Sequence, residues 1–444
     1  MLAAKKRLRN ELLNLFRSRF FLIFLILGTL IRIFIGVGLG SCSAFAPDEG
    51  AYLQLYKHTY EGKLAPEIFF THANSFFLAI YYLPTFLIHK LGISLILAIR
   101  FSSVAFFVIT SILVWGLLIR NPAAMYFEEK INKWHKLAFL FLGIPTVTIW
   151  ASLGLRDILI GLELCLISWA LIFFRRKNYI LSGVIMSIAL SGLINTRPYV
   201  YVLSVLALIS WLVVEREQKV VSKKILIIAL ALVLSMGSSP GTARSVHIPS
   251  VNWSKFNYSL SFNSMFSHTF PANSISLTEL RNCLKKNSLG VFSSVGKLVS
   301  SSSSSSSSSS TSNGSATDLS VQDTVGEIRN PLSLPIGLFY FLLSPIPGMN
   351  NGSLIANVAG LEIVFWLVLY LAFSISLWRR RSFGVRLDSV SIYAITWVTL
   401  FVVFSSLTEI NVGTMVRHRA MLVIPMCLVI ATTYRKEPKS IPVS

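Results

Sequence analysis

The stretch FFLIFLILGTLIRIFIGVGL, residues 20–39, decides the fold class of this chain. It is an unbroken apolar run of about the 20 residues that cross a bilayer as an α-helix. The rest of the chain has the same character, since 54% of its 444 residues are hydrophobic and only 13% are charged. A soluble fold of this length needs far less apolar surface. We therefore predict an all-α, polytopic membrane protein.

An export signal is the first alternative for this N-terminal region. The basic segment KKRLRN (5–10) precedes the apolar run, AFA (44–46) resembles a cleavage site and LGSC (39–42) resembles a lipoprotein box. The apolar run is longer than the 7–15 residues of a typical signal core. A retained membrane-spanning helix explains it better.

Apolar runs long enough to cross a membrane recur along the chain. We expect ten spans, near residues 20–40, 95–119, 137–153, 157–174, 179–196, 198–214, 225–238, 354–377, 390–408 and 418–434. The stretch 74–92 is an eleventh candidate by hydropathy alone. Its assignment decides on which side of the membrane every later segment lies.

Basic residues decide between ten and eleven spans. With ten, the short inner segments hold 24 Lys and Arg and the short outer segments hold seven. With eleven, 18 of those 24 would lie outside, against the cytoplasmic excess of basic residues. We therefore expect 74–92, and likewise the Pro-bounded run 334–348, to be helices in the outer interface. Both termini then lie in the cytoplasm.

This topology divides the chain into three parts. Residues 1–238 form an N-terminal transmembrane module with a first outer loop at 41–92, and residues 335–444 form a C-terminal transmembrane module. Between them, 239–334 is one long outer loop whose Ser-rich tract, 300–312, is expected to be disordered because it cannot build a core.

The net charge of +21 does not indicate a nucleic-acid partner. Its basic residues lie in short clusters between apolar runs, as topology signals do, and not on one face of a folded domain. The four cysteines show no CxxC spacing, so neither a zinc site nor a redox motif is indicated. A disulfide between Cys42 and Cys283 is left open.

Ten ionisable residues fall together at or near the outer face in this topology. They are Asp48, Glu49, His72, Arg100, Arg156, Asp157, Arg197, Arg417, His418 and Arg419. A charge near a span is costly unless it is paired or faces water, which makes such residues functional candidates. Structural explanations stay open for two of them: Asp157 suits the positive end of a helix dipole, and Arg197 could reach the interface from a tight turn.

Two carboxylates and several arginines at one membrane face suit a particular chemistry. Arginine binds phosphate bidentately and keeps its charge. A nearby carboxylate can act as general base on an acceptor hydroxyl while arginines stabilise the phosphate leaving group. This indicates sugar transfer from a polyprenyl phosphate. For Arg32, Glu163 and Glu362, which lie within spans, we expect structural pairing.

Several segments resemble the membrane-integral type C glycosyltransferases, especially the branch of protein O-mannosyltransferases and lipid A aminoarabinose transferases. The acidic string is Pro47-Asp48-Glu49 with Tyr52, followed by FLIHKLG (86–92) and LAIRFSS (97–103), which places Arg100 at the family arginine. Asp157 opens the fourth span, and NTRP (195–198) puts Arg197 at a turn that is basic in relatives. FTHANS (70–75) puts His72 where relatives carry a basic residue. The order of elements matches over residues 1–215, and RHRAMLVIPMCLVIA (417–431) resembles the final span of such enzymes.

The resemblance implies an inverting glycosyltransferase at the outer face of a bacterial inner or plasma membrane. Asp48 would be the general base, with Glu49 and Asp157 as further catalytic residues. Donor phosphate would be bound by Arg100, Arg156, Arg197, Arg417, Arg419 and His72. Some relatives use a divalent metal, which Asp48 and Glu49 would then bind, and others use none. The expected partners are a polyprenyl-phosphate-linked sugar, an acceptor glycan, lipid or protein, and the lipid bilayer.

Two other functions remain open. An O-antigen-type polysaccharide polymerase also needs outer arginines and a long outer loop, but it has less use for PDE directly after the first span. A lipid-linked oligosaccharide transporter or flippase predicts inverted repeats and Gly- or Pro-interrupted spans in matching halves, and the sequence has no such repeats.

Overall fold

The computed structural model describes residues 18–38, 49, 53, 56–57, 75–120, 133–214, 221–237, 251–252, 328–329, 331–344, 360–382, 387–408 and 412–433. Asp48, His72, the Ser-rich tract, Cys42 and Cys283 lie outside these residues. Every structural statement below concerns the described part of the chain.

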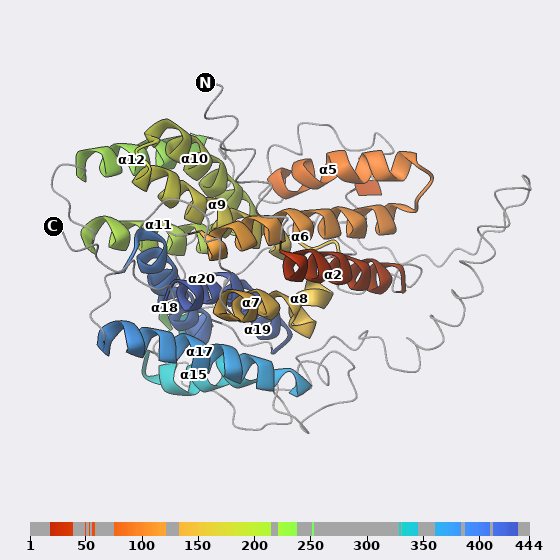
Figure 1. The fold of residues 1–444 in the computed structure, drawn as a ribbon. Coiled ribbons are helices and arrows are strands. Elements are labelled where there is room, and N and C mark those ends of the chain that lie inside the picture. Colours follow the sequence, from red (N-terminus) through yellow and green to blue (C-terminus); the bar gives the residue numbers. More distant parts are fainter. Residues whose placement is uncertain are drawn as a thin grey trace, which may run out of the picture.

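Helices make up almost all of this part (Figure 1). They are α2 (Arg19–Gly38), α5 (Ser75–Lys90), α6 (Leu95–Ile119), α7 (Lys133–Leu140), η1 (Phe141–Gly143), α8 (Pro145–Trp150), α9 (Asp157–Arg175), α10 (Tyr179–Thr196), α11 (Pro198–Val214), α12 (Val221–Gly237), η3 (Pro331–Ser333), α15 (Leu334–Leu343), α17 (Ile363–Ser382), α18 (Ser389–Thr408), α19 (Val412–Arg419), η4 (Ala420–Leu422) and α20 (Val423–Thr433). The all-α prediction is therefore confirmed for the described residues.

Within the described residues, seven helical segments are long and apolar enough to cross a membrane. They are Arg19–Gly38, Leu95–Ile119, Asp157–Arg175, Tyr179–Thr196, Ile363–Ser382, Ser389–Thr408 and Met415–Thr432. Three shorter apolar helices accompany them, at Pro198–Val214, Lys224–Ser235 and Pro331–Leu343. Large apolar side chains on α2, α10, α12 and α17 are exposed, as expected of helices that face lipid. The chain is a polytopic, α-helical membrane protein.

Contacts between helix ends show how the helices run. The end of α2 meets the start of α6, because Gly36 O accepts a hydrogen bond from Arg100 Nη1 (3.0 Å), whereas Phe21 near the start of α2 stacks on Trp115 near the end of α6. In the same way Tyr199 at the start of α11 stacks on Phe404 near the end of α18. Neighbouring helices of this kind are antiparallel.

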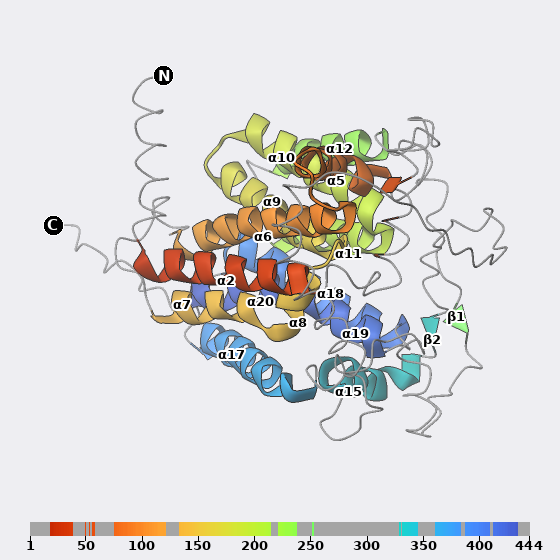
Figure 2. The same cartoon turned by 90° about the vertical axis from the view of Figure 1, so that its right-hand side faces the viewer.

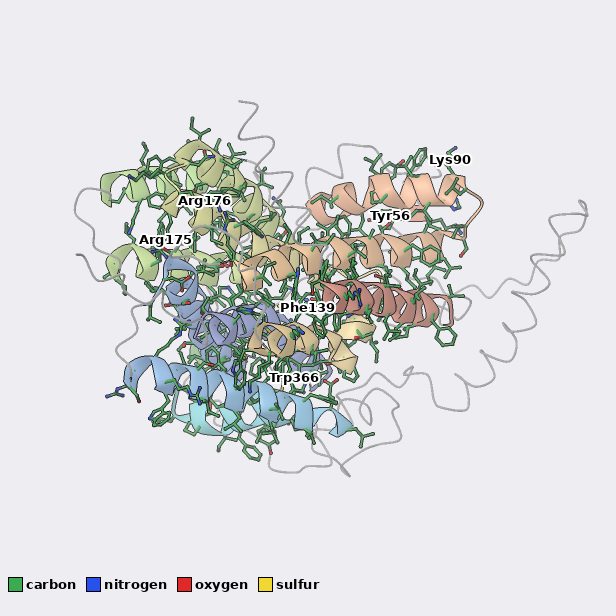
Figure 3. All side chains as sticks on the ribbon, viewed as in Figure 1. Tyr56, Lys90, Phe139, Arg175, Arg176 and Trp366 are labelled. Carbon is green, nitrogen blue, oxygen red and sulfur yellow. The ribbon has the colours of Figure 1, made fainter. Side chains whose placement is uncertain are left out.

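One end of the bundle collects the starts of α6, α9, α11, α17 and the α19–η4–α20 segment together with the ends of α2, α10, α12 and α18. We call it the Asp157 end, after the first residue of α9. Figure 3 shows Arg175 and Arg176, at the far end of α9, on the opposite side of the molecule from Tyr56 and Lys90. Arg379, Arg380 and Arg381 likewise close α17 at its far end.

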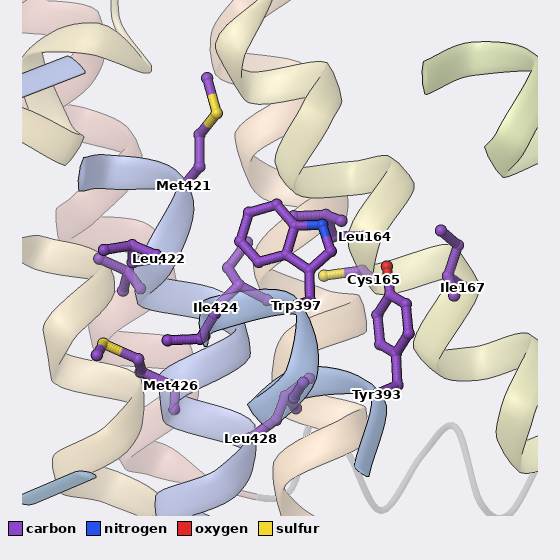
Figure 4. Close-up of a cluster of buried hydrophobic side chains, with 14 of the residues drawn as sticks. Leu164, Cys165, Ile167, Tyr393, Trp397, Met421, Leu422, Ile424, Met426 and Leu428 are labelled. Carbon is purple, nitrogen blue, oxygen red and sulfur yellow. The ribbon is translucent and has the colours of Figure 1, made fainter. Parts of the chain in front are cut away.

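The core is a continuous apolar layer between α9, α18 and α20 (Figure 4). Trp397 and Tyr393 of α18 lie beside Cys165 of α9 and Leu428 of α20, and all four are buried. Trp397 Nε1 donates to Ser204 Oγ at 3.1 Å, so the indole is satisfied inside the bundle. This packing fixes α9 and the α19–η4–α20 segment relative to each other, and those elements carry the candidate site.

Two expected spans are interrupted helices. The run at 137–153 folds as α7, η1 and α8, because Pro145 occupies the first turn of α8 and Ile144 before it is extended (φ −51°, ψ 133°). The run at 418–434 begins earlier, at α19, and passes through the single 3₁₀ turn η4. The expected span 354–377 begins, within the described residues, as α17 at Ile363 and continues to Ser382.

The helix α5 packs antiparallel on the first half of α6. Tyr81 OH lies 3.1 Å from Ser103 Oγ, and Thr85 Oγ1 lies 3.0 Å from Ser102 Oγ. With 16 residues, α5 is shorter than the about 20 that cross a bilayer. Its orientation in the outer interface stays a prediction.

A two-residue parallel pair joins the two borders of the long segment between α12 and α15. Val251 and Asn252 (β1) pair with Ile328 and Arg329 (β2). Figure 2 shows the pair at the edge of the molecule, on the side of α15 and α19. Two stretches that are far apart in the sequence therefore lie side by side.

Candidate functional site

Asp157 is the centre of a group of charged side chains. Arg417 Nε of α19 donates a hydrogen bond to Asp157 Oδ2, and Arg197 Nη2, from the junction of α10 and α11, lies 3.5 Å from Oδ1. Three segments that are far apart in the sequence thus meet at one carboxylate. All three side chains are almost fully buried, with relative exposures of 6–12%.

The local sequence explains why these side chains can meet. Pro198 begins α11 and forces Arg197 before it into an extended conformation (φ −149°, ψ 95°), which breaks α10 from α11. Arg197 N still donates to Leu193 O (2.8 Å), so the break occupies a single residue. Asp157 stands in the first turn of α9, where the helix dipole favours a negative charge. Asp157 therefore has both the helix-start position that the sequence suggested and ion pairs with two arginines.

Arg156 and His418 flank this carboxylate. Arg156 Nη1 donates to Thr196 O (3.1 Å), which ties the residue before α9 to the end of α10. His418 Nε2 lies 3.1 Å from Tyr199 OH, and its ring packs beside the rings of Tyr199 and Phe401. We call Arg156, Asp157, Arg197, Arg417 and His418 the Asp157 cluster. Two guanidinium groups, those of Arg197 and Arg417, pair with its carboxylate.

Glu49 and Arg100 form a second, fully buried pair. Arg100 Nε and Nη2 donate to Glu49 Oε1 (2.7 Å) and Oε2 (3.0 Å), and Arg100 Nη1 donates to Gly36 O. Gly154 N also donates to Glu49 Oε1 (3.3 Å). Both carboxylate oxygens are thus engaged, and neither side chain has exposed surface. Glu49 is thus bonded to Arg100 of α6 and to Gly154, in the turn before Arg156, while Arg100 links the pair to Gly36 of α2.

Arg419 lies apart from the Asp157 cluster, although only one residue separates it from Arg417. Its guanidinium is fully buried and donates to Leu342 O (2.9 Å) and Ser344 O at the end of α15. It also lies over the ring of Trp366. These contacts make Arg419 a cap for the last carbonyl groups of α15.

Glu362, just before α17, is a buried acceptor. Its carboxylate receives hydrogen bonds from Thr146 N (2.7 Å), Thr146 Oγ1 and Trp366 Nε1 (2.8 Å). Burial raises the pKa of Glu362, and the hydrogen bonds and the charge of Arg419 oppose this shift. The structural partner of Glu362 is thus Thr146, at the start of α8, as well as Trp366 of α17.

Arg32 and Glu163 use neutral partners. Arg32 donates to Gly28 O (3.0 Å), Leu142 O (3.0 Å) and Thr148 Oγ1 (3.3 Å), and it lies over the ring of Phe107. Glu163 Oε2 accepts a hydrogen bond from Thr196 Oγ1 (3.0 Å). Arg32 therefore joins α2 to the broken helix α7–η1–α8.

Metal binding has no support among the described residues, where no three His, Cys, Asp or Glu side chains are grouped to hold an ion. Cys165 and Cys427 are buried thiols without a disulfide. Asp48, the other expected metal ligand beside Glu49, lies outside the described part.

The sequence-based candidates thus fall into four sets. The Asp157 cluster gathers Arg156, Asp157, Arg197, Arg417 and His418; Glu49 and Arg100 form their own pair; Arg419 serves α15; and Asp48 and His72 are not described. Sequence reasoning missed Thr196, Tyr199 and Gly154, which hold the charged groups in place. Thr196 and Tyr199 could have been predicted, because they stand on either side of the Arg197-Pro198 break.

No protein-family model matches this chain, and no curated protein matches it.

Proposed function

We propose that this protein is a glycosyltransferase that moves a sugar from a polyprenyl-phosphate donor to an acceptor glycan, lipid or protein at the outer membrane face. The observation that supports it most is the Asp157 cluster, in which Arg197 and Arg417 pair with Asp157 from separate segments and Arg156 bonds to the carbonyl group of Thr196, the residue before Arg197. Guanidinium groups recognise phosphate oxygens in pairs and stay charged at every physiological pH.

The residue types of the cluster suit an anionic ligand. Arg197 and Arg417 come from separate segments and meet at one carboxylate, and guanidinium groups match the oxygens of a phosphate. A lipid-linked donor supplies such a phosphate, and its polyprenyl chain matches the surrounding bilayer.

The reaction follows from these groups. Asp48 takes the proton from the acceptor hydroxyl, whose oxygen attacks the anomeric carbon as the bond from that carbon to the phosphate oxygen breaks. The arginines stabilise the charge that develops on the leaving phosphate. The products are the glycosylated acceptor, polyprenyl phosphate and a protonated Asp48.

The contacts narrow the roles of three expected site residues. Glu49 and Arg100 satisfy each other, so we assign them to positioning the loop that carries Asp48, not to contact with substrate. Arg419 is already occupied by the carbonyl groups of α15, so we assign it to holding that helix. Donor binding is then left to Arg156, Arg197 and Arg417.

A ten-span topology fits this proposal. The seven long spans, the helices α11 and α12 and the broken helix α7–η1–α8 alternate in direction along the chain, and the long segment between α12 and α15 starts and returns at the Asp157 end. The basic groups Arg175–Lys177 and Arg379–Arg381 lie at the far ends of their helices, as the cytoplasmic excess of basic residues requires. In the proposed topology the Asp157 cluster lies on the outer side.

The test uses the full chain in vesicles that contain a polyprenyl-phosphate sugar with a radiolabelled sugar. We expect Arg417→Ala to lower the rate of sugar transfer about 100-fold, since loss of one donor to a developing oxyanion typically costs that much. Asp48→Asn should abolish transfer while membrane insertion persists. Arg381→Ala, an exposed arginine at the opposite end of the bundle, is the matched control and should transfer at the wild-type rate.

Full transfer by Arg417→Ala or Asp48→Asn would refute the assigned roles. A chain that ignores the monophosphate donor but joins oligosaccharides carried on a polyprenyl pyrophosphate would be a polymerase. Movement of such a lipid across the vesicle without bond formation would indicate a flippase.

A further inference from the structure

The carboxyl group of Glu163 lies inside the bundle, further along α9 than Asp157. Glu163 belongs to α9, a candidate membrane span, and is 4% exposed. Its Oε2 accepts a hydrogen bond from Thr196 Oγ1 at 3.0 Å. Within the described part of the chain, no hydrogen-bond partner of Oε1 is found. A carboxyl group in such a place is expensive.

The backbone of α10 leaves room for this carboxyl group at Gly192. A Cβ atom at position 192 would lie 2.8 Å from Glu163 Cδ and would overlap Oε1. Gly192 and Thr196 are four residues apart, so they present one face of α10 to Glu163. The glycine gives the carboxyl group space, and the threonine gives it a hydrogen bond.

Thr196 connects Glu163 to the Asp157 cluster. Its carbonyl oxygen accepts the hydrogen bond from Arg156 Nη1 (3.1 Å). The next residue is Arg197, whose guanidinium pairs with Asp157. A shift of Thr196 would therefore move the hydrogen-bond acceptor of Arg156 and the backbone next to Arg197.

We propose that Glu163 is a positioning residue that holds Thr196, and through it Arg156 and Arg197, in the geometry that binds the donor phosphate. This inference rests on the proposed function. An apolar side chain of similar length would fill the same space without the cost of burying a carboxyl group, so span stability alone gives no reason for a glutamate there.

The kinetic test uses two matched pairs of variants in reconstituted full-length protein. Thr196→Val removes the hydroxyl group at nearly constant shape and Thr196→Ser keeps it, while Glu163→Met removes the acceptor and Glu163→Gln keeps one. We expect Thr196→Val and Glu163→Met to raise KM for the polyprenyl-phosphate donor about tenfold, the worth of one buried hydrogen bond, with KM for the acceptor unchanged. The serine and glutamine variants should stay within about twofold of wild type for the same reason.

Equal KM values in Thr196→Val and Thr196→Ser would overturn the proposal. So would a parallel change of donor and acceptor KM, because a general loss of packing would produce it.

A second measurement needs no sugar transfer and so separates this inference from the proposed function. Phenylglyoxal modifies accessible guanidinium groups, and mass spectrometry of the peptide that contains Arg197 reports its modification rate in detergent-solubilised protein. We expect a several-fold faster modification of Arg197 in Thr196→Val and Glu163→Met than in wild type, with Arg381 unchanged in all. Equal rates at Arg197 would refute the positioning role even if the protein proves to be a glycosyltransferase. Faster rates would support it even if donor transfer is not found.

Discussion

The pair of Glu49 and Arg100 offers the sharpest test of how the site is held. In Glu49→Gln the side chain keeps its shape but loses its charge and one of its two acceptor oxygens. Arg100 then stays fully buried with only Gly36 O and one amide oxygen as acceptors. Removing one partner of a buried ion pair typically costs about 3–5 kcal/mol. Because the amide keeps one hydrogen bond, we expect a loss of about 3 kcal/mol in unfolding free energy.

For a chain of 444 residues each kcal/mol corresponds to about 1 °C, so the apparent unfolding midpoint should fall by about 3 °C. The midpoint can be measured in detergent micelles at pH 7 from the fraction of full-length protein that stays monodisperse after heating. Arg100→Met should lower it by a similar amount, since it leaves Glu49 as an unpaired buried carboxylate.

The double variant Glu49→Gln, Arg100→Met supplies the control. Once both charges are gone, neither is left unpaired, so the double variant should be more stable than either single variant. Midpoints within about 1 °C of wild type in the single variants would refute the reasoning. Additive losses in the double variant would refute it as well.

Two further predictions concern neighbouring contacts. In Gly154→Ala the new Cβ would lie 3.3 Å from Ile99 Cβ and would overlap Ile99 Cγ2, so we expect a loss of about 1–3 kcal/mol from overpacking, measured as a lower unfolding midpoint. Adding Ile99→Ala should cost less in this background than in wild type, and an equal cost would contradict the overlap. Because the folded chain has a raised pKa at Glu362, it binds the proton more tightly than the unfolded chain does, and stability should fall as pH rises from the ordinary value of 4.5 through the raised pKa. Glu362→Gln should lack this part of the pH dependence, so its midpoint relative to wild type should rise as the pH increases above 4.5. A difference that stays constant with pH would contradict the interpretation.

The sequence predicted the elements better than their contacts. Apolar runs marked α2, α6, α9, α10 and α18 closely, because each run is long, and burial in lipid demands that its backbone hydrogen bonds be satisfied within the helix. Breaks inside a run were harder to foresee. Pro145 splits one expected span, whereas Pro425 sits inside α20 near its start, and the sequence alone does not distinguish these outcomes.

For the candidate site, the sequence identified charged residues near one membrane face. It did not show which of them contact one another. Arg417 and Arg419 look equivalent in GTMVRHR, yet a separation of two residues turns them to different sides of one helix. Arg417 thus reaches Asp157, and Arg419 reaches the carbonyl groups of α15. The same holds for Glu49, whose partner Arg100 lies 51 positions away.

Hydropathy and the distribution of Lys and Arg by themselves determined that this chain is a polytopic helical membrane protein, because both are properties of single segments in contact with lipid or water. Which charges meet was decided only by the tertiary structure. Asp157, Arg197 and Arg417 are brought together by the packing of α9, α11, α18 and α20, which depends on apolar contacts between distant segments. Asp157 and Arg417, for example, are 260 residues apart. The cost of leaving a buried charge unpaired then selects the partners that this packing makes available.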